Sequence, residues 1–105
     1  MRNYEAIIGN LYPYDVDEYL IHKVCIDNSV IEEEEYTVAM KEKIARVSIE
    51  ILVNLTSLSS ESDSGYSLSY NVDKLKERIV FIARSNGFAD IAEQYSGEPK
   101  VEIMS

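Results

Sequence analysis

Hydrophobic residues recur every three or four positions along several stretches of the chain, the spacing that places them on one face of an amphipathic helix. In residues 15–26 the apolar positions are Val16, Tyr19, Leu20 and Val24. Asp15 is followed three residues later by an acid, a pattern that favours a helix N-terminus there. Residues 3–8 predict a short helix or turn before it, closed by Gly9 and Asn10.

The longest predicted helix lies between Tyr36 and Leu58. Two starting points fit the sequence, because Ser29 with Glu32 would form a capping box whereas Thr37 would be a later N-cap. We favour Thr37, which leaves the glutamates in the preceding connection. The apolar stripe of this helix consists of Met40, Ile44, Val47, Ile51, Leu55 and Leu58.

The second half of this helix is apolar around most of its circumference. A helix that is apolar all round must be enclosed all round. In a chain of 105 residues we expect too few other helices to enclose it, so part of the surface should contact another subunit. The residues assigned to this subunit interface are Ile49, Leu52 and Val53.

A polar run from Ser59 to Ser64 precedes a two-residue alternation in which Tyr66, Leu68 and Tyr70 are separated by serines. This alternation predicts a strand-like arm, and we assign its three apolar residues to the subunit interface as well. Asn71 is the expected N-cap of a further helix, whose stripe is Val72, Leu75, Ile79 and Ile82.

The end of that helix is predicted at residues 85–87, where Gly87 or Asn86 can adopt the left-handed conformation and Phe88 can fold back onto the last turn. Residues 88–95 predict one or two more helical turns before Gly97 and Pro99. The final KVEIMS is either frayed or a short added strand.

Together these elements predict a mainly α fold: a small bundle of about four helices with a short strand-like arm or hairpin between the two core helices. Residues 1–95 form a single helical domain, residues 59–70 its arm, and residues 96–105 a C-terminal tail.

The amino-acid composition excludes several classes of function. Ten Lys and Arg against 19 Asp and Glu give a formal net charge of −9, which argues against binding of phosphate backbones by counterion release. The four consecutive glutamates, Glu32–Glu35, are interpreted as a solvated loop or helix N-terminus. Neither a signal peptide nor a membrane-spanning run is evident, so a reducing cytoplasm is the expected location.

The residue chemistry predicts neither an enzyme nor a cofactor. His22 and Cys25 are three apart, but two ligands do not complete a zinc site. As a nucleophile and base they would lack an oxyanion hole. The eight tyrosines are a more useful signal, because tyrosine is enriched at protein interfaces, although many of them could simply cap a small core.

Three motifs, LYPYD, YT at the start of the long helix, and GYSLSY, resemble the small head–tail connector proteins of tailed bacteriophages and prophages over about residues 4–95. The resemblance implies a ring of identical subunits beneath the portal protein, joined to a tail-completion or stopper protein, through which DNA passes without specific binding. It implies a location in the host cytoplasm during assembly and then at the virion head–tail junction.

A ring is compatible with the composition, since a heterologous interface between apolar stripes can close on itself. The alternative is a small acidic helical interaction module, such as an antitoxin-like or regulatory binding protein. Acidity and exposed apolar surface fit both hypotheses, and genomic neighbours would distinguish them.

Overall fold

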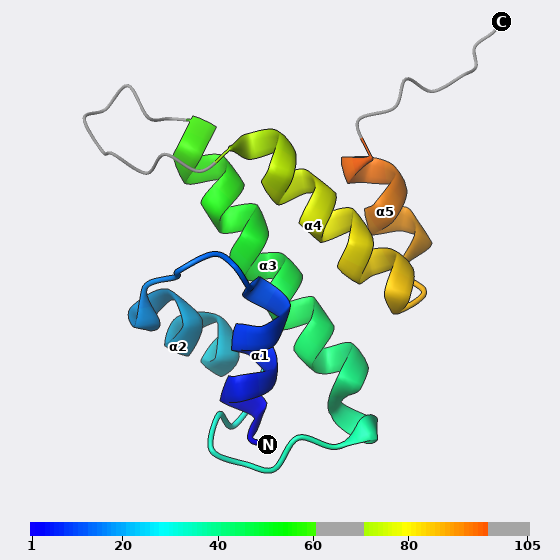
Figure 1. The fold of residues 1–105 in the computed structure, drawn as a ribbon. Helices are drawn as coiled ribbons and strands as arrows, with labels where there is room; N and C mark the ends of the chain where they lie inside the picture. Colours follow the sequence, from blue (N-terminus) through cyan, green and yellow to red (C-terminus); the bar gives the residue numbers. More distant parts are fainter. Residues whose placement is uncertain (61–70, 97–105) are drawn as a thin grey trace, which may run out of the picture.

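The computed structural model describes residues 1–60 and 71–96, and its regular structure is helical (Figure 1). The elements in chain order are α1 (Asn3–Leu11), α2 (Glu18–Asp27), the 3-10 turn η1 (Val38–Met40), α3 (Lys41–Ser60), α4 (Val72–Ser85) and α5 (Ala89–Tyr95). Within these described ranges there is no strand, only an isolated antiparallel bridge between Arg2 and Glu35. The predicted mainly α class is therefore confirmed.

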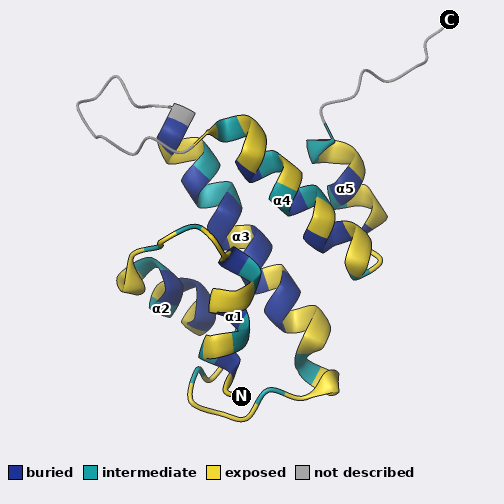
Figure 2. Cartoon of the chain, in the orientation of Figure 1, coloured by how far each residue is buried: buried dark blue, intermediate teal, exposed yellow. Residues whose placement is uncertain are grey.

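The central element is α3. It contacts α1 and α2, packs along α4, and α5 covers α4 from the other side (Figure 1). Buried apolar residues from all five helices form one hydrophobic core, and in Figure 2 dark blue buried positions recur along α3. No helix in the described ranges is both long and apolar enough to cross a membrane.

Burial along α3 corrects the expectation that another subunit must enclose this helix. Ile49 is 5% exposed and Leu52 is fully buried within the single chain, while Val53 is half-buried and packs against the core. These side chains are covered because α1, α2 and α4 all contact α3. Of the predicted stripe, Leu58 is 45% exposed, since it lies in the last turns of the helix.

Several helices begin or end at other residues than the sequence predicts. Gly9 lies inside α1 instead of ending it, and α2 begins at Glu18, three residues later than predicted. The reason for the second shift is that Asp17, not Asp15, is the N-cap: its carboxylate accepts a hydrogen bond from the Tyr19 N–H at 2.8 Å, which satisfies a backbone donor that has no partner within the helix. Ser59 and Ser60, predicted to open the arm, belong to α3.

The favoured start of the long helix is confirmed in position, because Thr37 is the N-cap residue. The first turn after it, however, is the 3-10 turn η1, and regular α geometry begins at Lys41. The Thr37 side chain makes no capping hydrogen bond. The glutamates therefore lie in the connection between α2 and η1, as expected.

The turn between α4 and α5 follows the prediction. Gly87 has a φ of 77°, a conformation that glycine adopts readily. The Phe88 N–H donates to the Ala83 carbonyl at 2.8 Å, and the Phe88 ring is buried with the Arg46 guanidinium 4.2 Å from its centroid. At the start of α4, the Asn71 side chain accepts from the Lys74 N–H.

Polar contacts tie the end of α1 to the two longest helices. Arg78 of α4 donates through Nε to the carbonyl of Asn10 at 2.9 Å, and the Asn10 amide donates to the Ser48 hydroxyl of α3 at 3.0 Å. A cation beside the last carbonyls of a helix complements its dipole. These contacts connect α1 with both α3 and α4.

Candidate functional site

The glutamate run forms an acidic loop, defined as Glu32–Glu35, that lies against the N-terminus of α1. The Asn3 N–H donates to the Glu34 carbonyl at 2.8 Å and the Tyr4 N–H donates to the Glu32 carbonyl at 3.0 Å. The Asn3 side chain, which is buried, donates to the Ile31 carbonyl at 2.9 Å. Backbone groups of α1 that lack partners within the helix are thus satisfied by this loop.

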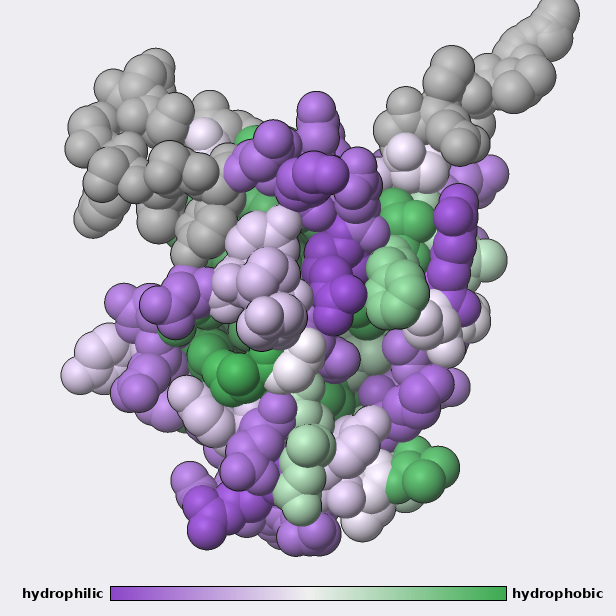
Figure 3. Space-filling model, in the orientation of Figure 1, coloured by the Kyte–Doolittle hydropathy of each residue, from purple (hydrophilic) through white to green (hydrophobic). Residues whose placement is uncertain are grey.

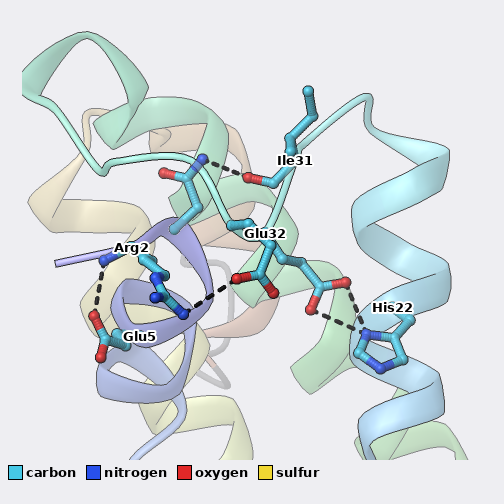
Figure 4. A network of polar contacts seen from close by, with 7 residues as sticks. Arg2, Glu5, His22, Ile31 and Glu32 are labelled. Atoms are coloured by element: carbon cyan, nitrogen blue, oxygen red, sulfur yellow. Dashed lines mark hydrogen bonds and ion pairs between the residues drawn. The ribbon is translucent and has the colours of Figure 1, made fainter.

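Side chains reinforce the same contact (Figure 4). Arg2 donates through Nη1 to Glu33 at 3.2 Å, and its backbone N–H donates to Glu5 at 2.8 Å. His22 of α2 points toward the loop, with Nδ1 at 2.7 and 3.0 Å from the two carboxylate oxygens of Glu32. The loop is therefore a structural connection between α1 and α2, and Glu33, Glu34 and Glu35 are solvent-exposed as interpreted from the sequence.

His22 and Cys25 do not act on each other in this arrangement. Cys25 is a free and fully buried thiol, whereas the His22 imidazole contacts Glu32. Burial and the nearby charge of Glu32 raise the pKa of Cys25 to about 11. The thiol is therefore protonated at neutral pH, and only a thiolate is an effective nucleophile or metal ligand.

Within residues 1–60 and 71–96, no group of three or more His, Cys, Asp or Glu side chains is arranged to hold a metal ion.

The predicted interface residues fall into two groups. Ile49 and Leu52 belong to the core described above, and Val53 packs against it. Tyr66, Leu68 and Tyr70, like most of the predicted arm, lie outside the described residues, so their role at an interface stays a prediction.

Large apolar side chains that remain exposed mark two other surfaces. On α2, Tyr19 is 81% and Ile26 is 75% exposed, and the spacing of seven residues places them on one face of the helix. On α4, Phe81 is 59% exposed and its ring lies 5.1 Å from the Arg78 guanidinium. In Figure 3 the hydrophobic surface on this side of the molecule is divided into patches bordered by hydrophilic residues.

Phe81 belongs to a surface groove of about 700 Å³ between α4 and α5. We refer to it as the α4–α5 groove; its walls include Lys76, Val80, Phe81, Arg84, Tyr95 and Ser96. Sequence analysis did not single out Val80 and Phe81. The sequence did contain a sign of this surface, because these two apolar residues of α4 fall outside its buried stripe of Leu75, Ile79 and Ile82.

Comparison with known proteins places the chain in a family. A family model described as "Family of unknown function (DUF6706)" matches residues 1–105, and the chain belongs to this family. Neither a curated protein nor a solved structure matches the chain. The fold and the surfaces therefore carry the functional argument.

Proposed function

We propose that the protein is a structural subunit of a bacteriophage head–tail connector, forming a ring between portal and tail through which DNA passes. The observation that carries the proposal is the packing of α3 along α4, with residues 61–70 joining the two helices. The connector resemblance implies this organisation, in which an arm extends between two core helices. The proposal assigns the chain no catalytic role and no cofactor.

The exposed face of α2 supports an assembly role. A ring of identical subunits needs two different surfaces on each subunit, one for each neighbour. Tyr19 and Ile26 supply exposed apolar area at one of them, and tyrosine is common at such contacts. The second surface is the arm, with Tyr66, Leu68 and Tyr70 as its anchors.

The arm is too short to be stable as an isolated hairpin, since it offers two or three strand residues on each face. In the proposed ring it adds to an edge or lies in a groove of the neighbouring subunit, where main-chain pairing and the apolar side chains both contribute. The portal protein and a tail-completion or stopper protein are the proposed axial partners.

The arm is tested by replacing Tyr66 and Leu68 together with serine. Because the core helices are stabilised elsewhere, circular dichroism should show helical content almost unchanged, whereas ring formation or docking to the portal should be lost in electron microscopy. Val38→Ser is the control, since Val38 is 89% exposed on η1 and outside the proposed interface. A double variant that assembles normally removes the arm from the interface, and one that unfolds places it in the core of the single chain.

The connector role itself is tested by imaging assembled particles with antibody-labelled protein. We expect the label on the portal–tail axis. Label elsewhere on the particle, or protein that is absent from particles altogether, contradicts the proposal. Genes for portal, capsid and tail proteins beside this gene would agree with it.

A second function is favoured by the distribution of charge. Residues 1–35 contain nine of the 19 acidic residues but only two of the ten Lys and Arg, so the part of the chain with α1, α2 and the acidic loop carries most of the net negative charge. An acidic interaction module that masks a basic partner would use this part of the molecule. Binding of such a partner that is lost at high salt, together with a toxin or regulator gene next to this gene, would favour it over the connector.

A further inference from the structure

The α4–α5 groove is lined by both apolar and charged side chains. Val80 and Tyr95 are half-buried, and Phe81 leaves more than half of its surface in contact with solvent. Pockets for small molecules of similar volume enclose most of their ligand. A groove with so exposed a wall fits an extended peptide segment better, because such a segment needs contact along one side only.

The described part of the chain ends at this groove. Ser96, the last described residue, lines it and follows directly after Tyr95, another wall residue. Gly97 and Pro99 come next, and both residue types favour a change of chain direction. At about 3.3 Å per residue, the nine residues 97–105 reach about 30 Å, whereas the 14 residues of α4 span about 21 Å. The segment is therefore long enough to lie along the whole groove.

The segment also has side chains that complement the groove. Its apolar residues Val101, Ile103 and Met104 match the apolar side chains that line the groove. Its acids, Glu98 and Glu102, complement two cations of the walls. These cations are Lys76 and Arg84, and neither forms an ion pair within the described residues.

Positively charged residues are also available for the acidic side chains that line the groove, either on α4 or in the C-terminal segment. Glu77 lies 3.7 Å from Lys74 of the same helix, and Asp73 also lines the groove. Lys100 lies between the two acids of the C-terminal segment, so the segment offers a countercharge for Asp73. The C-terminal segment thus complements the groove in apolar surface, in positive charge and in negative charge.

We propose that residues 98–104 dock into the α4–α5 groove of their own chain. Val101 and Ile103 pack on Val80, Phe81 and Tyr95, and the segment covers apolar surface that other proteins would otherwise contact. The inference does not depend on the connector role, because it concerns the free subunit.

The test uses the full chain with Val101 and Ile103 both replaced by serine. In two-dimensional NMR we expect the amide signals of Val80, Phe81 and Tyr95 to shift, and their neighbours on α4 to exchange hydrogen at least several-fold faster. Signals of Tyr19 and Ile26 on α2 should not change. Ile26→Ser is the control, because it removes an apolar side chain that is 75% exposed on α2, away from the groove.

A synthetic peptide with the sequence of residues 97–105, added to the double variant, should restore the original signals. The same peptide with the two serine replacements should not restore them. Unchanged groove signals in the double variant overturn the proposal. It is also overturned if the original signals appear only as protein concentration rises over a hundredfold range, since the occupant is then the segment of a second copy.

Discussion

At the scale of single residues, the structure separates two side chains that are close in sequence. His22 faces the acidic loop, where Glu32 binds it, while Cys25 faces the core. Both lie on α2, and the difference arises from the elements that pack on either side of the helix. His22 therefore makes a surface contact with Glu32, whereas Cys25 is a buried thiol that is protonated at neutral pH.

The raised pKa of Cys25, about 11 against an ordinary 9.0, leads to a prediction about reactivity. Two pKa units reduce the thiolate fraction at neutral pH about 100-fold. Iodoacetamide should therefore label the folded protein at least about 100-fold more slowly than the protein unfolded in guanidinium. Equal rates in the two states would contradict the buried position.

The same pKa predicts how stability changes with pH. The folded state holds the thiol proton more tightly than the unfolded state, so the stabilisation is complete below about pH 9 and is lost as pH rises to about 11. The loss is on the order of 2–3 kcal/mol. Urea unfolding of the native chain and of Cys25→Ala, at pH 8 and pH 10.5, measures it. The variant should lose less stability between the two pH values, because tyrosines and lysines titrate in both proteins.

At the scale of elements, helix ends are set by short-range polar contacts. Asn71 caps α4 through its side-chain oxygen, and Asp17 does the same for α2. We expect Asn71→Ala to lower the free energy of unfolding by about 1 kcal/mol, because the Lys74 N–H loses its partner. Asn71→Asp retains an acceptor and should remain near the native value. Equal losses in the two variants, measured by urea unfolding, would show that the cap is not responsible.

At the scale of the whole molecule, a single chain encloses α3. Leu52→Ala should therefore destabilise the isolated subunit by about 2–5 kcal/mol, since it leaves a cavity in the core. Val53→Ala, at the half-buried neighbouring position, should cost clearly less. Thermal unfolding of dilute protein distinguishes this result from an assembly role, in which Leu52→Ala would impair association and leave the subunit stable.

The predictions succeeded where the signal is local. The caps at Thr37 and Asn71 and the reversal at Gly87 were all placed correctly, because each depends on residues within one or two turns. The start of α2 was missed because Asp15 and Asp17 are both suitable caps, and only the structure shows that the Asp17 carboxylate accepts from the Tyr19 N–H. Ile49 and Leu52, which the sequence assigns to a subunit interface, are buried within the single chain because α1, α2 and α4 all contact α3.

By itself, the sequence of this protein determines the helices, most of their ends and the apolar faces that they bury, because propensities, caps and periodic stripes act between near neighbours. Only the tertiary structure decides which of those faces remains exposed. The pairing of His22 with Glu32 and the α4–α5 groove join residues from separate elements. Such contacts depend on how whole helices pack, and the amount of surface that packing covers cannot be read from the spacing of residues along one helix.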